Sequence, residues 1–182
     1  MQQVVHLRVL VDYEKDAFRD IEIRSDDSFL ILHEMIQQAF GFDNSQMSSF
    51  YVSNAEWEKG QEITLMEVMQ PEENGEPIWL MQDIELSKII FEKDQKLIYV
   101  FDFMLMWCFY IDAISIHEVE DTVILPRITQ EFGEAPEQYS KDSDIVFDGM
   151  ELQDDYDEDE EDEEDELDDI FKSMEGFDEN TM

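Results

Sequence analysis

The last part of the chain carries more negative charge than a packed core could accommodate. Residues 151–182 contain 18 Asp and Glu residues and one Lys, so their net charge is −17, whereas the whole chain of 182 residues has −38. Within residues 151–170 there are 15 acidic residues and no basic residue. Such a segment repels itself and buries too little apolar surface to offset the entropy lost on ordering. We therefore expect a globular domain over residues 1–148 and a disordered, low-complexity acidic tail over residues 149–182.

The globular part is also acidic, and this excludes some classes of partner. Residues 1–150 contain 31 acidic and 10 basic residues, a net charge of −21. This charge repels nucleic-acid phosphates and anionic lipid headgroups, so we expect neither direct nucleic-acid binding nor membrane binding. Cys108 is the only cysteine, which rules out an intramolecular disulfide and is typical of a reducing compartment. No apolar stretch reaches the ~20 residues that span a bilayer, so we expect a cytoplasmic protein.

The periodicity of the apolar residues predicts the secondary structure. β-Branched and alternating patterns predict strands over residues 4–11 and 18–24, joined as a hairpin. A helix is expected to begin after N-cap candidates at 25–28 and to end at Gly41. The remaining predicted elements are a strand over 48–54, a short helix over 84–91, and strands over 96–103 and 107–116. The order strand–strand–helix–strand, then helix–strand–strand, predicts an α+β fold with a small mixed sheet of hairpins rather than alternating βαβ units.

The sequence contains no recognisable catalytic or metal-binding motif. His6, His33 and His117 are not spaced as metal ligands, and there is no glycine-rich phosphate loop or nucleophile elbow. Cys108 lies between aromatic residues in an apolar strand, a setting typical of an inert core thiol. We therefore expect no catalytic residue, no metal ion and no cofactor.

Asp102 is an acid inside the most apolar segment of the chain, between Phe101 and Phe103. If strand alternation continues through this position, the carboxylate points away from both rings and into solvent. Alternatively, it is a buried, hydrogen-bonded carboxylate that orients a turn, or the remnant of a site. The sequence leaves these alternatives open.

The acidic tail ends with a short apolar pattern. Leu167, Ile170, Phe171 and Met174 are spaced i, i+3, i+4 and i+7, which predicts one face of a short amphipathic helix over 167–175. Such a face can dock in a groove of a partner protein, dock on its own domain, or stay unstructured. The acidic tract before it has three interpretations: a solubilising extension, an electrostatic capture device for a basic partner, or a mimic of the phosphate backbone.

Two segments resemble the signatures of a known family. Residues 32–44 (Leu-His-Glu-Met-Ile-Gln-Gln-Ala-Phe-Gly-Phe-Asp-Asn) resemble the helix-and-turn signature of the Ri-plasmid ORF-three-like family. Residues 99–103 (Tyr-Val-Phe-Asp-Phe), followed by Trp107, resemble its second signature, an aromatic strand that carries an acid. The likeness covers about residues 4–139 and implies an α+β fold in a bacterial or archaeal protein without an established reaction. The matching family positions, to which the resemblance assigns no role, are His33, Gly41, Phe42, Asp43, Asp102 and Trp107.

The chain departs from the family pattern where that pattern is most polar. Residues 104–106 are Met-Leu-Met where the family usually has Gly and two acids, and Cys108 and Phe109 replace a basic residue and His. A later Cys-Pro-Pro-acid loop is represented only by residues 135–137, Ala-Pro-Glu. If those polar groups form a catalytic or metal site in other members, this chain has lost most of it. The remaining matching positions therefore favour a scaffold role.

These observations favour a non-enzymatic protein-interaction module whose acidic tail binds a protein partner with a basic surface. A link to plasmid, mobile-element or nucleic-acid-handling machinery is one extension of this interpretation. Two alternatives remain: a degenerate or metal-dependent enzyme of the same family, and an inhibitor that mimics nucleic acid. Convergent polar groups in a pocket around Asp102 and His33 would favour the enzyme, whereas an aromatic plug there would favour the scaffold. The expected partner-binding residues are Leu167, Ile170, Phe171 and Met174.

Overall fold

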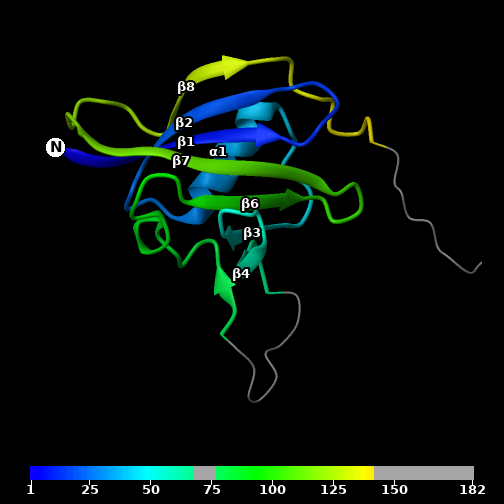
Figure 1. Cartoon of the computed structure of the whole chain (residues 1–182), viewed down its shortest axis with the longest axis horizontal. Coiled ribbons are helices and arrows are strands. Elements are labelled where there is room, and N and C mark those ends of the chain that lie inside the picture. The colour runs from blue at the N-terminus through cyan, green and yellow to red at the C-terminus, as the bar shows by residue number, and fades with distance from the viewer. Residues whose placement is uncertain (68–76, 142–182) are drawn as a thin grey trace, which may run out of the picture. The chain divides into compact units, whose positions relative to one another are not determined.

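The structure is a computed structural model that describes residues 1–67 and 77–141 of the chain. Within these ranges, one eight-stranded sheet lies against one α-helix (Figure 1). The elements in chain order are β1 (Gln2–Val11), β2 (Phe18–Arg24), α1 (Phe29–Phe40), β3 (Ser48–Ser53), β4 (Lys59–Thr64), β5 (Trp79–Leu80), the 3₁₀ turn η1 (Leu86–Lys88), β6 (Lys96–Phe101), β7 (Trp107–Val119) and β8 (Arg127–Phe132).

The sheet is built from hairpins around its two longest strands, β1 and β7. Its strand order is β5-β4-β3-β6-β7-β1-β2-β8, and neighbouring strands are antiparallel except for the parallel pair β4 and β5. In Figure 1 the connection between β1 and β2 and the turn between β6 and β7 lie at the same end of the sheet. This end therefore brings together segments that are distant in the sequence.

In the middle of β1, buried side chains alternate with partly exposed ones. Val5, Leu7 and Val9 on β1 are fully buried, whereas His6 and Arg8 between them are partly exposed. This alternation follows from the two-residue period of a strand. The aliphatic and β-branched side chains of β1 thus form one wall of the core.

The helix α1 covers the buried face of the sheet. The ring centroids of Phe29 on α1 and Phe50 on β3 lie 5.1 Å apart, and those of Phe40 on α1 and Phe109 on β7 lie 5.0 Å apart. Both pairs meet edge to face, an arrangement that aromatic quadrupoles favour. Ile36, between the two phenylalanines, is fully buried. The helix is therefore fixed to the sheet near both of its ends.

The opposite face of the sheet carries charged side chains on β1, β2 and β8, and the register pairs opposite charges there. Arg8 lies directly across from Asp20 on β2 and donates two hydrogen bonds of 2.8 Å to its carboxylate. Arg127 on β8 likewise lies across from Glu22, and its Nη2 lies 2.7 Å from Oε2 of that glutamate. Cross-strand pairs of opposite charge stabilise a sheet. This face therefore neutralises several of its acids locally.

The structure confirms the principal predicted elements but shows a larger sheet than predicted. Five predicted strands and the predicted helix correspond to β1, β2, α1, β3, β6 and β7. The sequence patterns do not predict β4, β5 or β8, and the expected small sheet is in fact eight-stranded. Most residues of β4 and β8 are exposed, so these strands carry no regular apolar alternation. The fold is α+β in composition but dominated by strands.

The helix predicted over 84–91 is wrong, because only the 3₁₀ turn η1 forms there. The backbone N–H of Leu86 donates to the carbonyl of Asp27 at 2.9 Å, and that of Ser87 to the carbonyl of Ser25 at 2.8 Å. These tertiary hydrogen bonds tie the segment to the start of α1. Tertiary contacts therefore override the helical spacing of the apolar residues.

The predicted acidic tail over 149–182 and its helix over 167–175 lie outside the described residues. The same holds for the domain boundary at residue 148 and for the apolar face of Leu167, Ile170, Phe171 and Met174. Among residues 1–67 and 77–141, no helix has the length and apolar character needed to cross a membrane.

Candidate functional site

The first family signature ends α1 and directs the chain back into the core. Gly41 has a φ of 72°, and its N–H donates to the carbonyl of Gln38 at 3.3 Å. Glycine adopts this left-handed conformation without the steric cost of a Cβ atom. The next residue, Phe42, is buried, and its ring centroid lies 5.7 Å from that of Phe101 and 5.3 Å from that of Trp107. The end of the helix thereby joins the aromatic strand of the second signature.

Asp43 holds a segment from the far end of the domain. Its backbone N–H donates to Oε1 of Gln138 at 2.7 Å, and its carboxylate accepts from Nε2 of the same glutamine at 2.8 Å. The carboxylate also accepts from the N–H of Ser45, at 3.0 Å, and from the hydroxyl of Tyr139. The hydrogen bonds from Ser45, Tyr139 and Gln138 lower the pKa of Asp43. The carboxylate therefore remains ionised well below neutral pH.

Trp107 of the second signature holds the same segment from the other side. The indole is fully buried, and its Nε1–H donates to the backbone carbonyl of Gln138 at 2.8 Å. The ammonium of Lys141 lies 4.3 Å from the centroid of the indole ring and donates to the carbonyl of Met106 at 3.0 Å. We call residues 138–141 the anchored segment. Residues from both signatures, Asp43 and Trp107, fix it against the domain.

Asp102 lies at the turn between β6 and β7, and its side chain is buried, with an exposed fraction of 4% for the residue. Its Oδ1 accepts from the N–H of Met104 at 2.9 Å and from the N–H of Leu105 at 3.1 Å. Its own N–H donates to the carbonyl of Met47 at 2.9 Å. The solvent-exposed alternative for Asp102 is therefore wrong, because the carboxylate is buried and orients the turn.

Substitutions at Asp102 are expected to distinguish the stabilisation by its hydrogen bonds from any effect of its negative charge. Asp102→Asn is expected to change the free energy of unfolding by less than about 1 kcal/mol, since Asn can accept the same hydrogen bonds and tolerates the φ of 59°. Asp102→Ala removes the acceptor from two partly buried N–H groups and is expected to cost about 1–3 kcal/mol. Urea denaturation measures both values. Equal losses for the Asn and Ala variants would contradict a capping role.

His33 lies inside the core, on the buried side of α1. Its Nδ1 lies 2.7 Å from the hydroxyl oxygen of Tyr99, and its Nε2 lies 2.5 Å from Oδ1 of Asn44. Nε2 of Gln37 donates to the same tyrosine hydroxyl at 2.9 Å. Burial lowers the pKa of His33, so the imidazole is neutral at pH 7. The ring therefore connects the helix, the sheet and the turn after Gly41.

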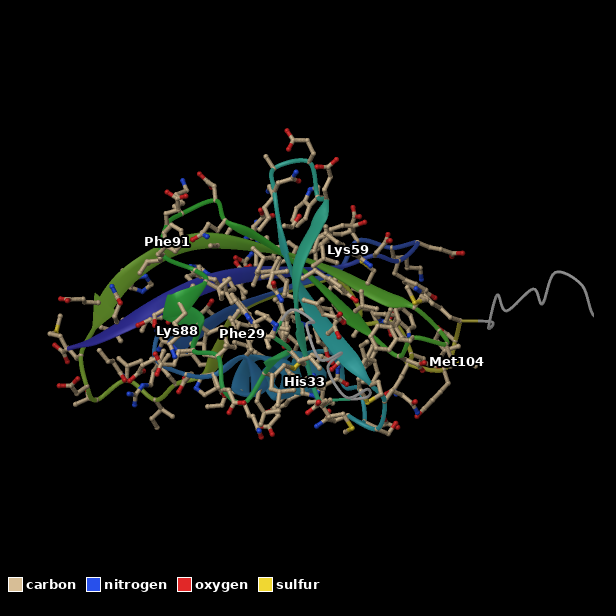
Figure 2. The ribbon with its side chains drawn as sticks, turned by 90° about the horizontal axis from the view of Figure 1, so that it is seen from below. Phe29, His33, Lys59, Lys88, Phe91 and Met104 are labelled. Atoms are coloured by element: carbon tan, nitrogen blue, oxygen red, sulfur yellow. The ribbon has the colours of Figure 1, made fainter. Side chains whose placement is uncertain are left out.

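His33 and Asp102 do not form a common site in the described part of the chain, since each is hydrogen-bonded to different groups. Figure 2 shows His33 beneath the sheet and Met104, beside Asp102 in sequence, at one end of the domain. Phe101, which precedes Asp102, and Trp107 both contact the ring of Phe42. Across residues 1–67 and 77–141, no three His, Cys, Asp or Glu side chains are grouped to hold a metal ion.

Cys108 is not in the core, contrary to the sequence-based interpretation. It lies on β7 between the buried residues Trp107 and Phe109, so it faces the polar side of the sheet and is partly exposed. Burial nevertheless raises the pKa of its thiol, and nearby Asp12 acts in the same direction. At neutral pH the group is a protonated thiol rather than a nucleophilic thiolate.

A hollow lies beside the anchored segment and was not predicted. It has a volume of about 640 Å³ and is lined by residues 12–14, 104–106 and 140–141. We call it the methionine hollow. Met104 and Met106 are 59% and 48% exposed. A sequence signal for it exists, because Met-Leu-Met between two predicted strands places large apolar side chains in a turn. Gln138 and Tyr139 lie at the same end of the domain, but no pattern in the sequence predicts their contacts.

Comparisons with known proteins bear on the two signatures and on the fold. A family model described as plasmid pRiA4b ORF-3-like protein matches residues 3–182. This match confirms the resemblance and extends it beyond residue 139. The solved structure of a protein of unknown function from Methanosarcina mazei Go1 is similar, with a TM-score of 0.59 and 20% sequence identity over 72% of this chain and 70% of that chain. Such a likeness shows the fold alone. No curated protein matches the chain.

Proposed function

The chain belongs to the plasmid pRiA4b ORF-3-like family, and we propose that this member is a non-enzymatic protein-binding module. In this proposal the acidic tail, residues 149–182, binds a basic surface of a protein partner. The observation that carries the proposal is the anchored segment. Asp43 and Trp107 hold Gln138 by hydrogen bonds, so the last described residues before the tail are fixed against the domain.

If the tail starts at a fixed place on the domain, its charges are concentrated near that place. A flexible segment tethered at one place has a high effective concentration near that place, and this concentration falls as the tether lengthens. A partner that contacts both the tail and the nearby domain surface thus gains affinity from two linked contacts. The −17 charge of residues 151–182 attracts the partner, and the domain surface adds selectivity.

The family positions support a scaffold role rather than a catalytic one. The carboxylate of Asp102 accepts hydrogen bonds from backbone N–H groups of its own turn, and both ring nitrogens of His33 lie within hydrogen-bond distance of protein groups. Gly41 and Phe42 end the helix and fill the core. Each of these residues thus has a structural role that explains its residue type.

Basic partners include proteins that handle nucleic acid, since such proteins carry Lys- and Arg-rich surfaces for phosphate contacts. The acidic tail would compete with nucleic acid for such a surface. We therefore infer that proteins of plasmid or mobile-element nucleic-acid machinery are the first class of partner to examine.

Phe171 is the side chain of the tail expected to anchor in the partner. If it enters a groove, Phe171→Ala lowers the affinity by about 1–3 kcal/mol, the range of a buried hot-spot residue. The partner is first captured from a lysate of the native host with the full chain, and its dissociation constant is then measured with purified proteins. Phe177→Ala is the matched control, because Phe177 lies beyond the predicted helix 167–175, after Gly176. Equal affinities of both variants and the unaltered chain would contradict anchoring by Phe171.

A further inference from the structure

The methionine hollow lies at the same end of the domain as the anchored segment, and two turns form its sides. One side comes from residues 12–14, which connect β1 and β2, and another from residues 104–106, which connect β6 and β7. Asp102 orients the second of these turns through its hydrogen bonds to Met104 and Leu105. The ring centroid of Tyr13 lies 5.7 Å from that of the buried Trp107. The hollow is thus built on groups that the core holds in place.

The lining of the hollow combines polar groups with the exposed side chains of Met104 and Met106. Methionine is unbranched and polarisable, so it adapts to different apolar partners. Met104 and Met106 together expose much of their surface, and exposed apolar groups gathered at one place mark interaction sites.

The charges around the hollow favour a basic occupant. Its charged lining residues are Asp12, Glu14 and Lys141. The ammonium of Lys141 is engaged within the domain by the carbonyl of Met106 and the ring of Trp107. The two carboxylates therefore remain to face an occupant. A second copy of the chain, with its own charge of −38, would be repelled.

We propose that the methionine hollow binds the apolar face of a basic amphipathic helix of the partner. The Lys and Arg side chains of that helix face Asp12 and Glu14, while its apolar side chains enter between Met104 and Met106. This inference rests on the proposed function and adds to it the docking surface and the class of partner segment. A helix that lays its apolar face into a groove is a recurring mode of peptide recognition.

The test uses the full chain labelled with ¹³C in its methionine methyl groups and a synthetic helical peptide as the probe. The peptide consists of leucine and lysine spaced to form one apolar and one basic face. We expect its addition to shift the methyl signals of Met104 and Met106. The signal of Met66, which is 53% exposed and does not line the hollow, should not move. A peptide of the same composition in scrambled order, which has no apolar face, should leave all three signals in place.

Variants give the second readout of the same test. Met104→Ser combined with Met106→Ser is expected to weaken binding of the leucine–lysine peptide about tenfold, whereas the control Met66→Ser leaves it unchanged. Equal binding of the ordered and scrambled peptides, with unmoved Met104 and Met106 signals, would overturn this inference but leave the proposed function intact. Failure of every basic peptide to bind at low salt would instead contradict the proposed function. Binding of a leucine–glutamate peptide as tight as that of the leucine–lysine peptide would overturn the basic specificity.

Discussion

Replacing Trp107 by alanine is expected to lower the free energy of unfolding by about 3–5 kcal/mol, the usual range for a buried large aromatic residue. The indole is fully buried and contacts the rings of Phe42 and Tyr13. It also donates the hydrogen bond that holds Gln138. The loss therefore combines a cavity with the release of the anchored segment. Urea denaturation followed by far-ultraviolet circular dichroism measures it.

Trp57 provides the matched control for this prediction. It is partly exposed, and its ring contacts Tyr110 and Lys96 on the polar side of the sheet. Trp57→Ala is therefore expected to cost no more than about 1–1.5 kcal/mol. Trp107→Phe keeps an aromatic ring but removes the N–H donor, so it should lie between the two alanine variants. If Trp107→Ala and Trp57→Ala cost the same, the central role of Trp107 in this end of the domain is contradicted.

Replacing Gly133 by alanine is expected to cost about 3 kcal/mol or more, which is a large effect for one added methyl group. Gly133 has a φ of 72°, and a Cβ atom there would lie 2.2 Å from the carbonyl oxygen of Asp16 and 2.9 Å from Cα of Ala17. Both contacts involve backbone, which cannot move aside as a side chain could. The carbonyl of Gly133 also accepts a hydrogen bond of 3.2 Å from the guanidinium of Arg19. A shift of this residue would therefore disturb the connection between β1 and β2.

A comparison with Gly41→Ala separates the free-energy cost of the left-handed backbone from the cost of the steric clash. It has the same φ of 72°, but an added Cβ atom would have no heavy atom within 4 Å. Gly41→Ala is therefore expected to cost only the left-handed backbone penalty of about 1–2 kcal/mol. Thermal or urea unfolding of the two variants side by side gives the difference. If Gly133→Ala is as mild as Gly41→Ala, the close approach at Asp16 is not a constraint on the fold.

The elements that sequence patterns predicted are those that place apolar side chains in the core. Alternation over residues 18–24 predicted β2 with its observed bounds, and apolar spacing with Gly41 predicted the end of α1. β8, the sequence Arg-Ile-Thr-Gln-Glu-Phe, is an edge strand with mainly exposed side chains, so burial imposes no periodic pattern on it. Such strands form because β2 offers unpaired backbone groups, which a local pattern does not reveal.

The family resemblance singled out residues of this end of the domain, but the sequence did not predict their roles or their partners. The resemblance to the family identified Asp43 and Trp107, yet both act on Gln138, which lies 95 and 31 positions away in the sequence. No rule of spacing connects residues so far apart when their link is a set of hydrogen bonds. For Asp102, the pattern left an exposed and a buried alternative because the strand ends one residue earlier, where alternation no longer determines the direction of the side chain.

The dissociation constant of the captured partner at two salt concentrations tests most directly whether the acidic tail acts as an electrostatic binding element. It is measured for the full chain and for a variant in which the acidic residues 157–166 are replaced by Gln and Asn, which keeps the length of the tail. Exposed charges are screened beyond about 10 Å at 0.1 M salt. For the unaltered chain we predict a loss of affinity of about tenfold or more between roughly 0.05 and 0.3 M salt, and a much smaller loss for the variant. Affinities that are the same for both proteins and insensitive to salt would contradict the proposed function.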